Sequence, residues 1–487
     1  MVYVIFAIFN VFWGRITGDE GFYAVVSRGV LEGMRPYRDF LFTQMPALPY
    51  IYAGWFSFFG PGIVSGRIFS ALLGAATVAL TASACYRHSG HKIAGLFGGL
   101  LLAANFSFVF DITKIKTQSL TAFFLSCAIF ILSGRRHANR LLTASFAMLF
   151  VSLALLTRLS ILPVLLFLWC YMGWLCRRNF KAYLVLLVVN IVVMLGMVAY
   201  FYDDGAMLFG VYGFHKEYYG FPAWNHAHFN EFLVGWMRNE LSVMLLFFAA
   251  IIYLGHLLFR ARKKIWHFAI RSLFPIFLLC SYLAATAIHC INVKSYPTHQ
   301  ISIMPIGVVF ATTVLSRPVF ALLKSKPVIA SLLFCALLII PMPLQDFVIN
   351  FNGNGSIGKT MEAAQIIRRN STRGDTILSF YGDLAVETGL TVLPGYEQNE
   401  FSYFPNMSNE RSLKLKTTNL PKLIDDLQSK KAHIVCITND SFSKMTLNNP
   451  AIMKQIKNIL ATNYQLVGKV TQYGQFFKDL YILKALP

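Results

Sequence analysis

The chain has 487 residues, of which 56% are hydrophobic, 15% are aromatic and only 13% are charged, with a formal net charge of +21. This composition excludes an ordinary soluble globular protein and is typical of a chain that crosses a membrane several times. The 8 cysteines lie mostly in or beside apolar runs, with no spacing typical of a disulfide framework or a zinc site. We therefore interpret them as small buried side chains.

Apolar runs of bilayer-spanning length recur from the N-terminus to about residue 344. They predict a polytopic α-helical membrane protein with about eleven transmembrane helices, at 2–14, 63–86, 93–111, 118–133, 141–157, 159–176, 182–201, 241–259, 272–290, 301–316 and 328–344. The first run is the weakest, because its 13 residues would extend only about 20 Å through a hydrocarbon core of about 30 Å. It has no basic segment before it, so we do not expect a cleaved signal peptide. A start site that trims the first helix is our hypothesis.

Five gaps between the predicted spans carry lysine and arginine but no aspartate or glutamate. They hold Arg87 and Lys92; Arg135, Arg136 and Arg140; Arg177, Arg178 and Lys181; Arg260, Arg262, Lys263, Lys264 and Arg271; and Arg317, Lys324 and Lys326. By the positive-inside rule these gaps are cytoplasmic, which places the other gaps and the C-terminal part on the external side. The positive net charge therefore indicates topology and no nucleic-acid partner.

The first external gap, Asp19–Gly60, is long enough to hold two helices of its own, near 20–33 and 46–59. The segment 46–60, PALPYIYAGWFSFFG, is the ambiguous one, because a twelfth span there would put all five basic gaps outside. Its length, its opening prolines and its Tyr and Trp residues favour a helix that lies in the membrane interface. We therefore expect two interfacial helices in this loop.

The second long external gap, 202–240, is rich in aromatic residues and histidines. His215, His226 and His228 could bind a metal ion, but no helix pattern that combines carboxylates with histidines accompanies them. We favour packing of these side chains against lipid headgroups.

The last part of the chain, 345–487, lacks the long apolar runs and predicts an external soluble α/β domain after a transmembrane domain at 1–344. The expected helices are 358–371, 420–430 and 450–463, and the expected strands are 376–382, 432–438, 464–472 and 478–485. No GxGxxG, P-loop or GxSxG motif occurs there. We place no chemistry in this domain and expect it to bind an acceptor or to cap the site.

Two carboxylates, Asp19 and Glu20, stand directly after the first apolar run. An acidic pair at that place does not stabilise the protein in a bilayer, and carboxylates in or beside a membrane are costly and usually functional. Asp19 is therefore the first candidate for a catalytic residue.

The run DEGFYAVVSRGVLEGMRPYRDFLFTQMPALPYIYAGWFSFFG, followed by Arg67 and a helix of small residues, resembles the start of the C-type membrane glycosyltransferases (GT-C). It looks most like the branch of protein O-mannosyltransferases and lipid A aminoarabinose transferases, whose first external loop begins with an Asp-Glu pair. The resemblance covers 1–344 and the general form of the soluble tail. It implies transfer of a sugar from a polyprenyl-phosphate donor to a lipid, glycan or protein acceptor on the external side. The compact tail and the lack of disulfides favour a bacterial inner membrane.

The resemblance also implies roles for single residues. Asp19 matches the family's aspartate and is expected to take the proton of the acceptor hydroxyl as it attacks the anomeric carbon, with inversion. Glu20 is a second catalytic candidate, although capping of the helix that follows explains it at least as well.

The leaving group would be a lipid phosphate, which gains negative charge as its bond to the sugar breaks, so fixed cations are expected to meet it. Lys294 and Arg158 are the candidates, because both lie at external ends of predicted spans. Tyr296 and His299 are expected to add hydrogen-bond donors. Snorkelling is the alternative for the two cations, and packing is the alternative for Tyr296 and His299.

One position departs from the family's pattern. Members often carry a second aspartate where the fourth span begins, and Gln118 stands there in this chain. Asp111, about two helical turns earlier, is the candidate substitute, with Lys114 and Lys116 nearby to pair with it or to bind phosphate. A pair of carboxylates would be the natural ligand set for a divalent cation. Because Gln118 stands in place of the second aspartate, we expect no cofactor, with a divalent metal as the alternative.

Two other classes of protein remain open. A lipid or solute transporter or flippase also has many spans with charges in them, but the chain shows no internal repeat and no paired broken helices. A glycan polymerase or ligase would lean on arginines in a large external loop, and 202–240 contains only Arg238. Both rank below the glycosyltransferase.

Overall fold

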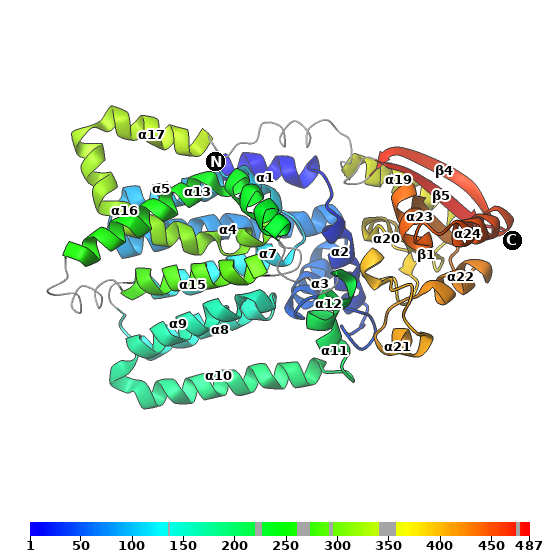
Figure 1. The fold of residues 1–487 in the computed structure, drawn as a ribbon, viewed down its shortest axis with the longest axis horizontal. Helices are drawn as coiled ribbons and strands as arrows, with labels where there is room; N and C mark the ends of the chain where they lie inside the picture. The colour runs from blue at the N-terminus through cyan, green and yellow to red at the C-terminus, as the bar shows by residue number, and fades with distance from the viewer. Residues whose placement is uncertain (135–136, 220–225, 261–272, 292–295, 340–356, 474–477) are drawn as a thin grey trace.

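The computed structural model describes residues 1–134, 137–219, 226–260, 273–291, 296–339, 357–473 and 478–487. Two parts lie end to end along the longest axis of the molecule (Figure 1). One is a bundle of helices, and the other is smaller and contains a β-sheet. Segments of the two predicted external loops lie between the two parts (Figure 1).

The bundle consists of apolar helices in the ranges where spans were predicted. They are α1 (Val2–Phe12), α4 (Ile63–Ser89), α5 (Lys92–Ala103), α6 (Phe106–Ile112), α7 (Thr117–Leu132), α8 (Arg140–Leu155), α9 (Leu162–Leu175), α10 (Phe180–Phe201), α13 (His226–Arg260), α15 (Leu273–Ile291), α16 (Met304–Ser325) and α17 (Pro327–Ile339). Among the described residues, five helices are long and apolar enough to cross a membrane, or six if the bent pair α5 and α6 counts as one span. The predicted total of about eleven is not confirmed, because several helices, such as the 16-residue α7, are shorter than a core of about 30 Å requires.

The predicted span 93–111 is a bent pair of helices rather than one straight helix. α5 and α6 meet at an angle of 68°. Asn105 stands at the bend, and its side chain accepts a hydrogen bond from the backbone N–H of Phe108 at 2.8 Å, which caps the start of α6. This cap begins a new helix in a direction that the apolar pattern alone does not reveal.

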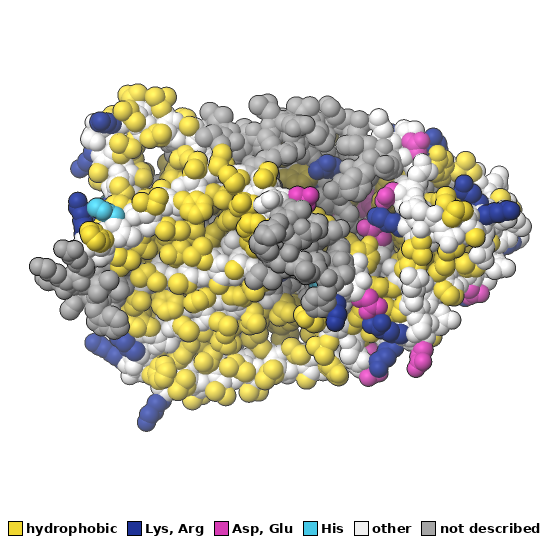
Figure 2. All heavy atoms as spheres, viewed as in Figure 1, with side chains coloured by type: hydrophobic (Ala, Val, Ile, Leu, Met, Phe, Trp, Pro, Cys, Tyr) yellow, Lys and Arg dark blue, Asp and Glu magenta, His cyan; other side chains and the backbone are white. Residues whose placement is uncertain are grey.

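Basic side chains gather at the end of the bundle that lies away from the sheet, and hydrophobic side chains cover its middle (Figure 2). α10 begins at this basic end, directly after Arg177 and Arg178 (Figure 1). This is the distribution that the positive-inside rule requires of a chain whose sheet part lies outside the membrane.

The first predicted external loop contains α2 (Gly18–Leu31) and α3 (Ala47–Phe59), close to the two predicted ranges. α2 is buried along most of its length, from Glu20 to Gly29. The sheet part packs against it, so protein rather than lipid headgroups covers this helix. The sequence analysis expected this helix in the membrane interface. An apolar helix with few charges suits a membrane interface and a protein interior equally well, so the sequence does not distinguish the two.

The second predicted external loop contains α11 (Ala206–Leu208), the π-helix η3 (Phe209–Gly213) and α12 (Phe214–Tyr219). The ring of Phe214 meets the ring of Phe401 edge-on, with centroids 5.8 Å apart, so this loop packs against the sheet part as well. The side chains of His226 and His228 lie outside the described part of the chain.

The described strands of the sheet part are β1 (Thr376–Ser379), β2 (Thr391–Val392), β3 (Ile434–Thr438), β4 (Tyr464–Tyr473) and β5 (Lys478–Ala485), in the order β2-β1-β3-β5-β4. β2, β1 and β3 are parallel, and β5 runs antiparallel to both β3 and β4. The helices are α19 (Ile357–Asn370), α20 (Gly382–Thr388), α21 (Asn409–Lys414), α22 (Leu420–Gln428), α23 (Asn439–Thr446) and α24 (Pro450–Asn463), with the 3₁₀ helix η6 (Asn399–Ser402).

This arrangement has the α/β form expected from the sequence. β2 was missed because 2 residues are too few for an alternating pattern. The predicted boundary between 344 and 345 lies outside the described residues, so the division into two domains stays a prediction.

The sheet part contacts α2 through a side chain, Arg28, and through a close approach of two backbones. The guanidinium of Arg28 donates hydrogen bonds to the backbone carbonyls of Ala385 and Leu390, each at 2.7 Å. The backbones of Gly21 and Gly382 touch, since a Cβ on Gly382 would lie 2.7 Å from the carbonyl carbon of Gly21. No side chain fits between the two backbones, so the close approach depends on both glycines.

Replacing Gly21 by Ala should force α2 and α20 apart and destabilise the protein by about 1–3 kcal/mol, the usual penalty of overpacking. The measurement is the melting temperature of the purified protein in detergent. Gly54→Ala in α3 is the matched control, because nothing lies within 4 Å of its Cβ position, and it should leave the melting temperature unchanged or raise it. Equal melting temperatures for the two variants would contradict the close contact.

A buried ion pair joins the start of α2 to α4. Glu20 and Arg67 are both fully buried, and the guanidinium donates to each carboxylate oxygen at 2.7 Å. Arg67 also donates to the backbone carbonyls of Asn10, Gly14 and Arg15, at the end of α1 and just beyond it. One side chain therefore fixes α1, α2 and α4 relative to one another.

Replacing Arg67 by Met should destabilise the protein by about 3–5 kcal/mol, because it leaves the carboxylate of Glu20 buried without its main partner. Thermal unfolding and the yield of monodisperse protein in detergent measure this loss. The double variant with Glu20→Leu should recover part of the stability, since it removes the unpaired charge as well. A double variant that is less stable than the single variant would show that the ion pair of Glu20 and Arg67 does not fix α1, α2 and α4 relative to one another.

Candidate active site

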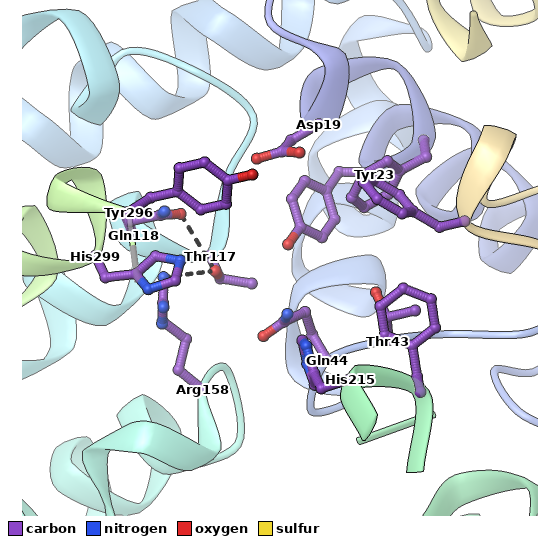
Figure 3. A pocket seen from close by; sticks show the side chains of 13 residues that line it. Asp19, Tyr23, Thr43, Gln44, Thr117, Gln118, Arg158, His215, Tyr296 and His299 are labelled. Atoms are coloured by element: carbon purple, nitrogen blue, oxygen red, sulfur yellow. Dashed lines mark hydrogen bonds between the residues drawn. The ribbon is translucent and has the colours of Figure 1, made fainter. Parts of the chain in front are cut away.

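A cavity opens where the bundle, α2, α12 and η6 meet, at the end of the bundle that faces the sheet (Figure 3). It encloses about 100 Å³. Its lining residues are Asp19, Phe22, Tyr23, Thr43, Gln44, Thr117, Gln118, Arg158, Phe214, His215, Tyr296, His299 and Phe401. Most of these side chains are polar, which distinguishes the cavity from the apolar core around it.

Asp19 lies in the first turn of α2, and its carboxylate faces the cavity beside the hydroxyl of Tyr296 (Figure 3). Burial raises the pKa of Asp19 above its ordinary value of 3.8. Lys116 and Arg158 act in the opposite direction, while the negative charges of Asp111 and Glu20 raise the pKa further. A carboxylate with a raised pKa that faces a cavity is suited to accept a proton.

Glu20 is the next residue but lies outside the cavity lining. Its carboxylate is held by Arg67, by the backbone N–H of Thr17 at 3.0 Å and by Lys114 at 4.0 Å. Burial alone would raise its pKa, but Arg67 and Lys114 outweigh burial and lower the pKa to about 2. With Thr17, Glu20 forms a capping box at the start of α2. This geometry fits the capping interpretation of Glu20, and the carboxylate of Glu20 does not face the cavity.

Arg158 stands in the turn between α8 and α9, just before the short 3₁₀ helix Leu159–Ile161. It is buried, and its Nη1 lies 3.4 Å from the hydroxyl oxygen of Thr117. Its Nε has no hydrogen-bond partner in the described part of the chain. Arg158 thus lines the cavity and keeps one donor unused in the described part of the chain, as an anion-binding residue would.

Three further predicted residues line the same cavity: Gln118 at the start of α7, Tyr296, and His299 in the 3₁₀ helix η5 (Pro297–Ser302). Burial and the charge of Arg158 hold the pKa of His299 well below its ordinary value of 6.5. Burial and Arg158 also lower the pKa of His215, which comes from α12. Both imidazoles are therefore neutral at pH 7 and act as hydrogen-bonding groups rather than as cations.

Asp111 does not line the cavity. Its carboxylate accepts a hydrogen bond from Lys116 at 2.9 Å, in a buried ion pair close enough to Asp19 to influence its pKa. Lys294 lies outside the described residues, so its predicted role stays a prediction. The structure thus brings five of the eight predicted site residues into one cavity: Asp19, Gln118, Arg158, Tyr296 and His299.

The sequence analysis missed several lining residues. Tyr23 follows Asp19 by four residues, and this helical spacing on one face could have revealed it. Phe401 comes from the sheet part, and no signal in the sequence connects it with Asp19. His215 was noted as a possible metal ligand and lines the cavity instead.

The described residues contain no group of three or more His, Cys, Asp or Glu side chains that could hold a metal ion. In the described lining, Asp19 is the one carboxylate. The expectation of a metal-independent site stays a prediction.

No protein-family model and no curated protein sequence matches this chain. Solved structures do match. ArnT from Cupriavidus metallidurans bound to undecaprenyl phosphate has a TM-score of 0.63 at 14% identity, with 99% of this chain and 96% of that chain covered. The same protein in the apo state has a TM-score of 0.60 at 13% identity, again over 99% and 96% of the two chains.

The archaeal oligosaccharyltransferase AglB from Archaeoglobus fulgidus, in complex with an inhibitory peptide and a dolichol-phosphate, has a TM-score of 0.52 at 12% identity. The match covers 95% of this chain and 72% of that one. Identities this low establish the fold alone. The chain therefore has the fold of the C-type membrane glycosyltransferases, as the motif that begins with Asp19 and Glu20 predicted.

Proposed function

We propose that this protein is a glycosyltransferase that moves a sugar from a polyprenyl-phosphate donor to an acceptor hydroxyl on the external face of a bacterial inner membrane. One observation carries the proposal: the carboxylate of Asp19 and the guanidinium of Arg158 face the same cavity in a GT-C fold. A base and a cation on either side of the reacting carbon are what transfer from a phosphate leaving group requires.

Each of the two charges has a defined task in this reaction. Asp19 takes the proton of the acceptor hydroxyl, whose oxygen forms a bond with the anomeric carbon. The bond between that carbon and the phosphate oxygen breaks, and its electron pair leaves with the phosphate. Arg158 receives the growing negative charge, and Lys294 is the proposed second cation. The attack comes from the side opposite to the phosphate, so the configuration inverts.

The solved relatives support the proposed donor. ArnT was solved with undecaprenyl phosphate and AglB with a dolichol-phosphate, and both ligands are polyprenyl phosphates. The acceptor is proposed only as a nucleophile of a lipid, a glycan or a protein. No cofactor takes part in the proposed reaction.

Replacing Asp19 by Asn should lower the transfer rate by about 10²–10⁴-fold, because the amide cannot accept the proton. Donor binding, expression and the melting temperature should stay near those of the wild type. Transfer from a polyprenyl-phosphate sugar by purified protein in detergent measures the rate and separates catalysis from transport, which detergent abolishes. Glu32→Gln is the control, because Glu32 is an exposed carboxylate at the end of the same helix. Rapid transfer by the Asp19 variant would exclude this residue as the base.

The pH dependence of transfer should follow the charges around Asp19. The base works only when it is deprotonated, and its raised pKa places the loss of activity on acidification above pH 3.8. Asp111→Asn removes a negative charge that raises this pKa, so the acid limb of the rate profile should move to lower pH. Lys116→Met removes a positive charge and should move the limb to higher pH.

The control for the pH profiles is Asp425→Asn, which changes an exposed acid of the sheet part. It should leave the acid limb where the wild type has it. Shifts in the opposite directions, or the same profile for all variants, would contradict the assignment of Asp19 as the titrating group.

A further inference from the structure

The cavity wall combines two charged side chains with a larger set of uncharged polar ones. The uncharged ones are Tyr23, Thr43, Gln44, Thr117, Gln118, His215, Tyr296 and His299. They offer hydroxyl, amide and imidazole groups, each of which can donate and accept hydrogen bonds. Groups of this kind pair with sugar hydroxyls, which also both donate and accept.

Both charged groups of the described lining already have a task in the proposed reaction. Asp19 must stay free to take a proton, and Arg158 must meet the phosphate. Close to these two groups, Asp111 pairs with Lys116, and Glu20 pairs with Arg67 and Lys114. None of these five residues lines the cavity. Apart from Asp19 and Arg158, the described wall therefore offers no counter-charge to a charged substituent on the sugar.

Gln118 connects the uncharged wall to the anion site. Its amide oxygen accepts a hydrogen bond from the hydroxyl of Thr117 at 3.3 Å, and the same hydroxyl lies 3.4 Å from Arg158 (Figure 3). The N–H groups of Gln118 have no partner among the described residues. Gln44 faces Gln118 across the cavity (Figure 3). A sugar whose phosphate rests on Arg158 would thus lie between two amides.

We propose that the transferred sugar is neutral: a polyhydroxylated sugar without an amino or a carboxylate group. This inference rests on the proposed function and adds the chemical class of the donor. A buried ammonium or carboxylate without a counter-charge is strongly disfavoured, whereas hydroxyls match the wall of amides and hydroxyls group by group. Gln44 and Gln118 are the specificity-determining residues.

The test compares the affinities of four soluble probes for the purified protein in detergent, by native mass spectrometry or intrinsic tryptophan fluorescence. The probes are farnesyl phosphate and its esters with mannose, 4-amino-4-deoxyarabinose and glucuronic acid. The mannose ester should bind about 10-fold more tightly than farnesyl phosphate alone, which corresponds to about 1.4 kcal/mol of added binding free energy. The cationic and the anionic sugars should bind no better than farnesyl phosphate.

Two variants of Gln118 sharpen the test. Gln118→Ala should remove most of the preference for mannose over farnesyl phosphate. Gln118→Glu keeps the shape but adds a carboxylate, and it should shift the preference toward the cationic amino sugar. Gln465→Ala, an exposed position on β4, is the control and should keep the wild-type preference.

The outcomes separate this inference from the proposed function. Equal or tighter binding of the amino sugar or the uronic acid by the wild type would overturn the neutral-sugar proposal and leave the polyprenyl-phosphate reaction standing. Binding of farnesyl phosphate without any gain from mannose would do the same. No binding of any probe, or binding that Arg158→Ala does not weaken, would overturn the proposed function and the neutral sugar with it.

Discussion

The buried ion pair of Glu20 and Arg67 is the constraint on which the site depends. Two charges without water must satisfy each other and all their hydrogen bonds within the protein, which permits few arrangements of the segments that carry them. Arg67 meets this requirement by binding the carboxylate and the backbone at the end of α1. The pair therefore fixes the start of α2, and the carboxylate of Asp19, one residue earlier, is directed into the cavity.

The sheet part contributes to the site by supporting α2 and by lining the cavity. It supports α2 through Arg28 and the contact between Gly21 and Gly382, and it contributes Phe401 to the cavity wall. Exposed ion pairs also join α21 to the second loop, such as Arg411 with Glu217, but exposed pairs stabilise little. The buried contacts behind α2 are the ones that position Asp19.

The two charged residues of the described cavity lining lie on different segments of the chain. Asp19 faces the cavity from α2, and Arg158 faces it from the turn between α8 and α9. Burial and, to a smaller extent, the charge of Arg158 lower the pKa of His215 and of His299, which keeps both rings neutral. In the described lining, Arg158 is the one cation, and it stands among uncharged hydrogen-bonding groups. Such a place suits one phosphate group, and the uncharged groups remain for the sugar that is transferred.

Local pattern was sufficient to predict much of this protein. Apolar runs and basic gaps predicted the bundle and its charged end, and the motif around Asp19 predicted the fold class. The resemblance to the family, rather than this motif alone, singled out Arg158, Tyr296 and His299, and it placed Gln118 where the family has an aspartate. All four residues line the cavity. The bend at Asn105 could not be predicted, because a straight helix and a bent pair of helices have the same apolar composition. The packing of the sheet part on α2 could not be predicted either, because a helix in the membrane interface and a helix buried in protein can have the same composition.

The sequence by itself determined that carboxylates and cations stand at the ends of apolar runs. The tertiary structure decided which of them share a cavity. Asp19 and Glu20 are neighbours, but successive side chains on a helix point about 100° apart, so one faces the cavity and the other faces Arg67. The partner of Glu20 lies 47 residues away, and Phe401 comes from the far end of the chain. Which charge stays available for chemistry depends on such long-range contacts, and no local pattern contains them.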